Sequence, residues 1–572
     1  MQDNTLTNKL NKRERYKARL RPYDYFEQFE ALDFENLGEG DRFYLQDFGV
    51  FTTSFLEDEF NIRVRVPAGR LSSEQFLHIG KIIKEYDLTL ILTVRAGLQI
   101  HGVEADNILT IWKQLNSLGL STWQSFGDNI RNIVTDVYDG IGRYNKIEVY
   151  PLIMQMQDHI LKNPRYVGML PRRISIGISG NYANVSSFFA NDIYFALAKK
   201  GDTFGFNVYM GGKNTELAKD ADIFLEKHEV FDFFKAFVEA FYLHGSRFTR
   251  SKTRLFHMIE SIGMPALKAF IQKEYAKEFE GSGELFLQRE EFKESEILQD
   301  NSYGFRYQSD FGRLSTQEIE MLCHYVGKNN ATIRIGIDQN LYLCGLKDNT
   351  VAFQSQKQSA TIVTCAGNLC PYSFWSIKDE TSYLPLEKIY KHAIEVGFSG
   401  CAKGCGRHRH TDIGLIGLKT NNFGDTEGGA RVFLGAQHSN GSSIGRMVFS
   451  MVPFVHLHHT ITLIIEIFEQ SGYKIFEDYS TNVLNKYTEG FLGLWFLANL
   501  TTKQKLVFEE QDSQNDFEYE KALLYKYFPD EDFLKLIDEN FYNAISILSK
   551  QLWTVEGKNP NYKPPIKREK FR

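Results

Sequence analysis

The stretch GRLSSEQFLHIGKII, residues 69–83, has a second version in the same chain, GRLSTQEIEMLCHYV at residues 312–326. With the same offset of 243 residues, LTVRAGLQIHGV at 92–103 falls on IGIDQNLYLCGL at 335–346. Each pair predicts a helix followed by a strand. Because two successive elements recur at one offset, the sequence predicts a fold built from two similar halves.

The similarity continues towards the C-terminus. The segment ISGNYANVSSFFANDIYFALA at 178–198 aligns without a gap with FSGCAKGCGRHRHTDIGLIGL at 398–418. The alignment places Asp192 on Asp412, and each copy is followed by a β-rich run that ends in small residues. We therefore expect the duplication to be nearly complete.

Each half alternates strand-like with helix-like segments, which predicts α+β or α/β layers with helices packed on sheets. The polar, acidic stretch at 278–302 contains a Gly-Ser-Gly break and predicts a linker between the halves. The most apolar stretch, 447–468, contains three histidines, Pro453 and Glu466. It predicts a buried strand end followed by a helix, because these residues are wrong for a lipid-facing span.

The composition bounds the class of protein. A chain of 572 residues is too long for one hydrophobic core, so several domains are expected. The apolar content of 43% and the net charge of −6 favour a globular protein, with no nucleic-acid partner and no membrane span. The N-terminus is polar and lacks the apolar segment of a secretory signal, so the expected location is cytoplasmic.

Four of the six cysteines are clustered, as Cys365 and Cys370 followed by Cys401 and Cys405. So few cysteines in a long cytosolic chain argue against a disulfide framework and favour metal binding or catalysis. In the first copy the positions of the last two are Asn and Val, so the scaffold does not need thiols there. The wide spacing favours an iron–sulfur cluster, while a zinc site and no metal at all remain open.

Several arginines lie in or beside strand-like apolar runs, where a solvated surface arginine would be unusual. They are either ion-paired within the fold or form an anion pocket, because planar guanidinium groups suit carboxylates and small oxyanions. These residues are Arg63, Arg65, Arg95, Arg131, Arg172 and Arg173.

Together these motifs resemble the siroheme- and 4Fe-4S-dependent nitrite and sulfite reductases, of the ferredoxin-linked or hemoprotein beta-component type. The resemblance covers residues 40 to 500, and its most specific motif is GCAKGCGRHRHTDIGLIG at 400–417. Further motifs are FNIRVRVPAG at 60–69, GDNIRN at 127–132, LPRRIS at 170–175, GFNVYMGG at 205–212 and RFTRSKTR at 247–254.

The resemblance implies an α+β fold of two pseudo-symmetric repeats, with siroheme between them. Each repeat is a ferredoxin-like half-module plus a larger α/β siroheme/4Fe-4S module. The expected domains are an N-terminal extension (1–40), the first half-module (41–115), the first α/β module (116–277), the linker (278–302), the second half-module (303–355), the second module with the cluster cysteines (356–504) and a C-terminal extension (505–572).

The resemblance also implies site residues. Cys365, Cys370, Cys401 and Cys405 would ligate the 4Fe-4S cluster, and Cys405 would also bridge it to the siroheme iron. The substrate anion would meet Arg65, Arg131, Arg173 and Ser175. The remaining expected cofactor contacts are Arg63, Arg95, Asn129, Asn132, Asn207, Gly211, Gly212 and Arg407.

The implied activity is the six-electron reduction of nitrite to ammonia or of sulfite to sulfide. No flavin or nicotinamide domain is apparent, so the electrons would come from ferredoxin or a flavoprotein subunit. Ser175 stands where sulfite reductases carry a second lysine, and fewer cations disfavour a dianion, so the sequence leans towards nitrite.

Two departures from the family pattern, the missing second lysine and a shortened cysteine pair, keep other readings open. The first cysteine pair is C-x4-C where the family usually has C-x5-C, which makes that loop one residue tighter. One alternative is a non-catalytic paralogue that acts as a structural subunit or siroheme carrier. The other is a zinc-stabilised α/β binding protein.

Overall fold

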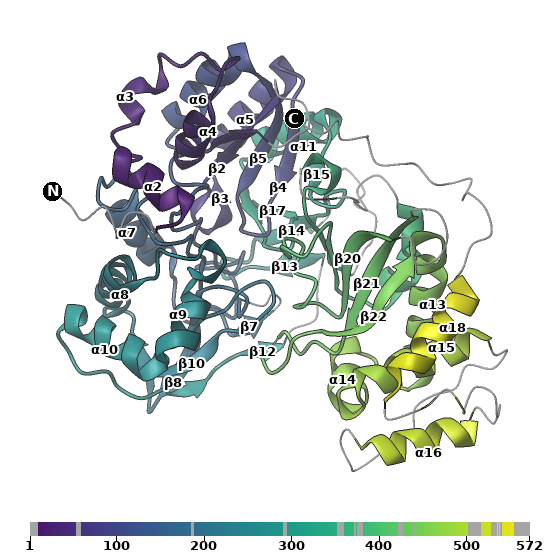
Figure 1. The fold of residues 1–572 in the computed structure, drawn as a ribbon. Coiled ribbons are helices and arrows are strands. Elements are labelled where there is room, and N and C mark those ends of the chain that lie inside the picture. Colours follow the sequence, from purple (N-terminus) through teal and green to yellow (C-terminus); the bar gives the residue numbers. More distant parts are fainter. Residues whose placement is uncertain are drawn as a thin grey trace. The chain divides into compact units, whose positions relative to one another are not determined.

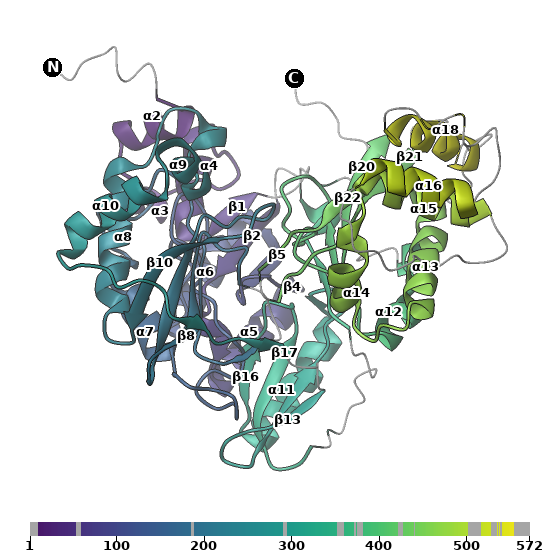
Figure 2. The same cartoon turned by 90° about the horizontal axis from the view of Figure 1, so that it is seen from below.

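The computed structural model describes residues 10–52, 59–184, 188–289, 294–349, 351, 360–370, 373, 381–420, 427–439, 441–501, 516–527, 535, 537 and 540–553. The chain forms two compact units, unit 1 at residues 1–356 and unit 2 at residues 357–572. Figures 1 and 2 show the helices and strands of each unit in two views.

Two five-stranded sheets of unit 1 follow the same plan, and each takes its last strand from the other part of the chain. The first runs β1 (Val50–Thr52), β2 (Glu59–Val64), β5 (Leu98–Glu104), β4 (Thr89–Leu92) and β15 (Arg313–Leu314). The second runs β13 (Ser295–Ile297), β14 (Tyr303–Tyr307), β17 (Leu341–Leu346), β16 (Thr332–Ile335) and β3 (Arg70–Leu71). This exchange ties residues 50–104 to residues 295–346.

The opening repeat folds as its sequence predicts. In each copy a serine, Ser72 or Ser315, caps a helix through a reciprocal capping box, and two strands follow the helix. The helices are α5 (Ser73–Glu85) and α11 (Thr316–Asn329), which pack on each other. The predicted order of helix and strand is confirmed in both copies.

A third sheet of unit 1 has the order β10 (Lys219–Glu226), β9 (Thr203–Met210), β8 (Ile193–Lys200) and β11 (Glu284–Leu285), with β6 (Ile176–Ser179) parallel to β8. Its core includes side chains of α7 (Tyr150–Ile160), α8 (Val230–His244), α9 (Leu255–Ile262) and α10 (Met264–Tyr275). Figure 2 shows α8 and α10 beside this sheet. The unit also contains α6 (Ile108–Ser117), the pair β7 (Ala183–Asn184) and β12 (Gln288–Arg289), and the short helices η1 (Gln46–Phe48), η2 (Pro67–Gly69), η3 (Ala105–Asn107) and η4 (Arg250–Lys252).

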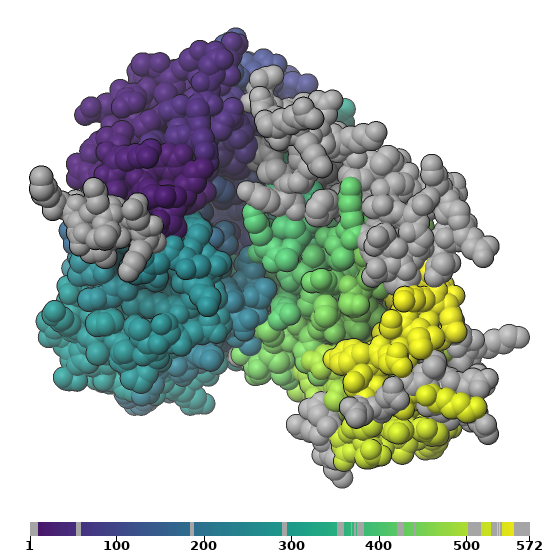
Figure 3. All heavy atoms as spheres, in the orientation of Figure 1, coloured from purple at the N-terminus to yellow at the C-terminus, as the bar shows by residue number. Residues whose placement is uncertain are grey.

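The N-terminal segment is packed into unit 1. It contains α2 (Lys12–Arg19), α3 (Phe26–Phe29) and α4 (Glu39–Leu45), and Phe29 lies fully buried in the core. Asn11 caps α2 with its side chain and donates from Nδ2 to the backbone oxygen of Arg247, at 2.7 Å. In Figure 3 this purple segment meets the teal part of the chain on the surface.

Unit 2 contains one five-stranded sheet, β18 (Ile362–Thr364), β19 (Val396–Ser399), β20 (Ile413–Thr420), β21 (Glu427–Leu434) and β22 (Arg446–Pro453). The first three strands are parallel and the last two antiparallel. Helices α13 (Phe454–Gln470) and α15 (Glu489–Thr501) pack on it, and Figure 1 shows them with α18 (Tyr542–Trp553). The remaining helices are α12 (Leu386–Lys391), α14 (Phe476–Asn482), α16 (Phe517–Tyr527), η5 (Gly367–Leu369), η6 (Thr381–Tyr383) and η7 (Leu484–Lys486).

The strand and helix predicted at 447–468 are confirmed, because β22 ends at Pro453 and α13 begins at Phe454. Among the helices that the structure describes, none is long and apolar enough to cross a membrane. The stretch 278–302 contributes the short strands β11, β12 and β13. Strands of two or three residues leave no periodicity in a sequence, which is why they were not predicted.

Candidate functional site

Two arginines of unit 1 share one aromatic ring. The guanidinium carbon of Arg63, on β2, lies 4.7 Å from the centre of the Phe126 ring, and that of Arg131 lies 4.9 Å from it. Phe51 stacks on Phe126 with ring centres 4.7 Å apart, and Arg63 also lies over Phe51. The ring quadrupole attracts each cation, so Phe126 holds two like charges in one place.

Arg131 is the most confined of these cations, with a residue exposure of 4%. Burial lowers the pKa of its guanidinium well below the usual value, and Arg63, Arg173 and Arg95 lower it further. Its Nη1 donates to the backbone oxygen of Ser125 at 2.7 Å, while its buried Nε has no hydrogen-bond partner in the described part of the chain. We call the group Arg63, Arg95, Arg131 and Arg173 the arginine cluster; such a group favours binding of an anion.

The negative charge of Asp128 partly offsets the charge of Arg131, but its carboxylate oxygens contact two other cations. Lys17 Nζ lies 2.9 Å and Arg250 Nη2 lies 2.6 Å from its oxygens. Burial alone would raise the pKa of Asp128, yet these two cations hold it below its usual range. Asp128 is therefore shared with Lys17 and Arg250 rather than paired with the arginine cluster alone.

Arg65, a predicted substrate contact, binds the protein itself. Its Nη1 donates to the backbone oxygens of Ile130 at 2.7 Å and Gln124 at 3.2 Å, and its Nη2 to that of Arg131 at 3.2 Å. Its Nε donates to Gln157 Oε1 at 3.3 Å. The side chain is fully buried, which lowers its pKa to about 10. This geometry favours a positioning role, in which Arg65 fixes the loop that carries Arg131.

Ser175, the other unusual predicted contact, is bound to Asp192. Its Oγ donates to Asp192 Oδ2 at 2.7 Å and accepts from the backbone N–H of Asp192 at 3.1 Å. Arg254 Nη2 lies 2.7 Å from Asp192 Oδ1 and balances its charge. The single hydroxyl donor of Ser175 is therefore used within the scaffold.

The three predicted asparagines also have protein partners. Asn129 donates to Asp47 and Phe126 and accepts from the backbone of Gly168, and Asn207 exchanges two hydrogen bonds of 2.8 Å with Gly283. Asn132 donates to the backbone oxygens of Val66 and Arg95, at 2.6 and 2.8 Å. Its buried Oδ1 has no partner among the described residues, so Asn132 offers an acceptor beside the Arg95 loop.

The predicted glycines are needed by the chain itself. A Cβ at Gly212 would lie 2.1 Å from the backbone oxygen of Asn191 and 2.4 Å from that of Phe189, which is too close for any side chain. Gly211 has a φ of +89°, the left-handed region that favours glycine. Close approach of backbone explains Gly212 and the positive φ explains Gly211, in both cases without a ligand.

In unit 2 the structure brings the four clustered thiols near one another. Cys365 follows β18, and Cys401 and Cys405 follow β19, the parallel neighbour of β18. Burial raises the pKa of Cys365 to about 11, and Cys405 and Cys370 raise it further. Burial and Cys405 likewise raise the pKa of Cys401. Cys365 and Cys401 are therefore less acidic than an ordinary thiol, and a cationic partner such as a metal would favour their thiolates.

Backbone donors point at one of these sulfurs. The N–H groups of Gly367 and Gly400 each donate to Cys365 Sγ at 3.2 Å, an arrangement that suits a cluster thiolate. Within the described ranges, no three His, Cys, Asp or Glu side chains are grouped as ligands of one metal ion.

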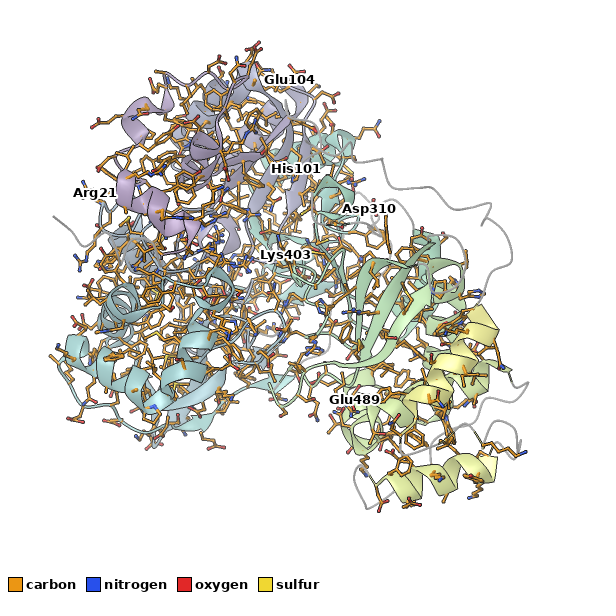
Figure 4. The ribbon with its side chains drawn as sticks, viewed as in Figure 1. Arg21, His101, Glu104, Asp310, Lys403 and Glu489 are labelled. Atoms are coloured by element: carbon orange, nitrogen blue, oxygen red, sulfur yellow. The ribbon has the colours of Figure 1, made fainter. Side chains whose placement is uncertain are left out.

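The loop between Cys405 and β20 is shaped by Arg407. This residue has a φ of +57°, donates its N–H to the Gly404 oxygen at 3.1 Å and accepts from the N–H of His410 at 2.8 Å. Lys403, labelled in Figure 4, lies on the same loop between the two thiols. The predicted cofactor contact of Arg407 stays a prediction.

Sequence reasoning missed the buried acids that hold the site. The arginines of RFTRSKTR each pair with one acid, Arg247 with Glu14, Arg250 with Asp128 and Arg254 with Asp192. The spacing of the arginines in that motif was the one feature of the sequence that could have indicated these acidic partners. Phe126 and Lys17 gave no signal, because their importance depends on which distant residues they contact.

Comparison with known proteins identifies the class. The nitrite and sulphite reductase 4Fe-4S domain matches residues 126–279, and the nitrite/sulfite reductase ferredoxin-like half domain matches residues 56–118. These matches confirm the resemblance seen in the sequence and define an oxidoreductase. Residues 56–118 and 126–279 thus match two domains of the nitrite and sulfite reductases.

Individual relatives agree. The ferredoxin–nitrite reductase of Synechococcus elongatus is 25% identical over 482 residues, which cover 78% of this chain and 94% of that protein. The chloroplastic ferredoxin–nitrite reductase of Spinacia oleracea is 25% identical and covers 69% of this chain and 72% of its own. The structure of the Mycobacterium tuberculosis NirA protein has the same fold, with a TM-score of 0.75 at 21% identity over 82% of this chain and 96% of its own. The mixed α and β fold is thereby confirmed.

Proposed function

We propose that this chain reduces nitrite to ammonia, with sulfite to sulfide as the alternative reaction, at a siroheme coupled to a 4Fe-4S cluster. The observation that carries the proposal is the arginine cluster. A buried Nε of Arg131 without a partner among the described residues, in a field of three further guanidinium groups, supports binding of a small oxyanion. The relatives named ferredoxin–nitrite reductase support nitrite.

The cofactors would be held by residues already described. Cys365, Cys370, Cys401 and Cys405 would ligate the cluster, and Cys405 would also contact siroheme. Arg63 and Arg95 would bind carboxylates of siroheme, for which guanidinium groups are suited. When bound, the two groups supply single electrons and a place for the anion to be reduced.

The chain's own residues would orient the anion and set its charge environment. Arg131 and Arg173 would donate hydrogen bonds to it, and Phe126 would keep Arg131 from turning away. Ser175 is neutral and therefore adds no charge, and its hydroxyl hydrogen is donated to Asp192. A pocket with one cation fewer suits a monoanion such as nitrite better than a dianion.

We also propose that the chain is a duplicated module with the domain boundaries predicted from the sequence. The backbone N–H of Ser175 donates to Asp192 Oδ2 at 2.8 Å, and that of Glu395 donates to Asp412 Oδ2 at 2.9 Å. In both places a parallel strand pair follows directly, β6 with β8 and β19 with β20. The two identical arrangements support a common origin.

The electron donor in this proposal is ferredoxin or a flavoprotein subunit. Support comes from the relatives, whose names include ferredoxin. A titration of the reduced donor against the loaded protein, with nitrite as acceptor, tests this part.

A second candidate is a siroheme-carrying paralogue without activity. One observation favours it, because two of the four predicted substrate contacts, Arg65 and Ser175, are bound to the scaffold. The deciding experiment is expression together with siroheme synthesis, followed by the visible spectrum, the iron content and assays of nitrite and sulfite with reduced viologen. Colourless, iron-free protein would overturn the cofactor proposal. A fully loaded protein that reduces neither anion would favour the paralogue.

A further inference from the structure

One buried histidine of unit 2, His438, lies among three acids that come from three different parts of the chain. His438 is 4% exposed, and its Nε2 lies 3.6 Å from Glu395 and from Glu477 and 3.7 Å from Asp412. Glu395 directly precedes β19, Asp412 directly precedes β20, and Glu477 belongs to α14. At these distances the interaction is one of charge, and neither ring nitrogen has a hydrogen bond in the described part of the chain.

Two of the three acids around His438 are deeply buried. Asp412 is 1% exposed and Glu477 4%, so both are out of solvent. Burial alone would lower the pKa of His438, but Glu395, Glu477 and Asp412 raise it to about 9. The imidazole is therefore charged at neutral pH, and its loss would leave three carboxylates facing one another in a buried place.

Asp192 in unit 1 and Asp412 in unit 2 accept matching backbone hydrogen bonds, but their charged neighbours differ. In unit 1 Asp192 forms an ion pair with Arg254 at 2.7 Å, its one ion pair among the described residues. In unit 2 the corresponding Asp412 shares the charge of His438 with two further acids. More of the local structure of unit 2 thus depends on one cation.

The acids around His438 fix the two ends of one loop. Asp412 Oδ2 accepts from the backbone of Glu395 at 2.9 Å, so the start of β19 is tied to the start of β20. Between these two acids lie Cys401 and Cys405. Glu477 Oε1 accepts from both the backbone and the hydroxyl of Ser439, which fixes the loop of His438 itself.

We propose that His438 in its charged form is a positioning residue, which holds Glu395 and Asp412 together and thereby keeps Cys401 and Cys405 placed for the cluster. The inference rests on the proposed 4Fe-4S site. It adds a residue outside the thiol motif and predicts that the cluster is retained less well as His438 loses its proton.

The test uses the loaded protein and measures loss of bound iron over time after dilution into chelator, at pH values from 7 to 10. The native protein should lose iron slowly at pH 7 and about tenfold faster above pH 9. His438→Gln should lose iron at the fast rate at every pH. His438→Lys should stay slow beyond pH 9, because an ammonium group keeps its charge there.

Matched variants separate charge from general damage. His458→Gln, at an exposed position of α13, should behave as the native protein. Adding Glu395→Gln to His438→Gln should slow the loss, since one of the repelling charges is gone. Equal iron retention and an equal pH profile in the native protein and His438→Gln would overturn the proposal.

A failure of the proposed function is recognised separately. If the native chain never binds iron, the cluster proposal fails, and the readout becomes alkylation of Cys401 and Cys405 followed by mass spectrometry. Faster labelling in His438→Gln than in the native chain, restored by His438→Lys, would still support positioning. Identical labelling in all three would overturn it.

Discussion

Replacing Asp128 by asparagine should weaken unit 1 and at the same time strengthen anion binding. The Asp128 side chain is 1% exposed and contacts both Lys17 and Arg250. Removing one member of a buried ion pair costs about 3–5 kcal/mol. Lys17 keeps Glu14 at 2.6 Å, so we expect the lower end, about 3 kcal/mol of unfolding free energy.

The effect on the anion has the opposite sign. Asp128 is the acid that raises the pKa of Arg131 against the other guanidinium groups. Asp128→Asn removes a negative charge beside the arginine cluster, so while Arg131 stays protonated the electrostatic potential there becomes more positive, and the KM for nitrite should fall while stability falls. If Asp128 only stabilised the fold, its replacement would also lower stability, but the KM for nitrite would rise instead of falling.

The assay is urea unfolding of the native and variant proteins, paired with nitrite kinetics. Asp24→Asn is the control, because its partner Arg21, labelled in Figure 4, lies on the surface, and it should change neither quantity. The pKa of Asp128 is lowered on folding, so its contribution is present above the ordinary value of 3.8 and persists below it. Equal urea midpoints for the native protein and Asp128→Asn would refute this account of the ion pairs.

Three further predictions concern single residues. Arg131→Lys removes the unpartnered Nε and the planar contact with Phe126, and should raise the KM for nitrite about tenfold or more, measured with reduced viologen. Cys405→Ser should lose bound iron, whereas Cys344→Ala, at a buried thiol whose pKa is raised to about 11, should keep it; equal iron contents would contradict the assignment of the four thiols. Ser175→Lys should raise sulfite turnover relative to nitrite, but less than tenfold, since the new ammonium would meet Asp192; a ratio that does not move would remove charge as the basis of selectivity.

The local parts of the fold could be predicted because their causes are local. Ser72 and Ser315 cap their helices through residues three positions on, and Pro453 marks the change from β22 to α13. The thiols were also visible, because spacing alone relates Cys365 to Cys370 and Cys401 to Cys405. Each of these signals lies within a few residues of the structure it specifies.

The different roles of the arginines could not be predicted from the sequence in the same way. Arg63 lies on β2, whereas Arg65 lies one residue past the end of that strand at Val64. Arg63 lies over Phe126, and Arg65 donates to backbone oxygens of Gln124, Ile130 and Arg131. Residues two apart on a regular strand point to the same face, so the strand pattern alone gives both arginines the same role, and only the tertiary packing separates them. A motif with two arginines therefore predicts one anion contact more than the structure supports.

The matched acids of the two units suggest how one scaffold can carry two chemistries. Asp192 and Asp412 accept the same backbone hydrogen bond, so the local fold does not distinguish them. Asp192 forms an ion pair with Arg254, whereas Asp412 and two further carboxylates lie around His438. A buried excess of negative charge repels an oxyanion. In this account the acids near His438 restrict anion binding to the arginine cluster of unit 1 and leave the thiol loop of unit 2 to the cluster.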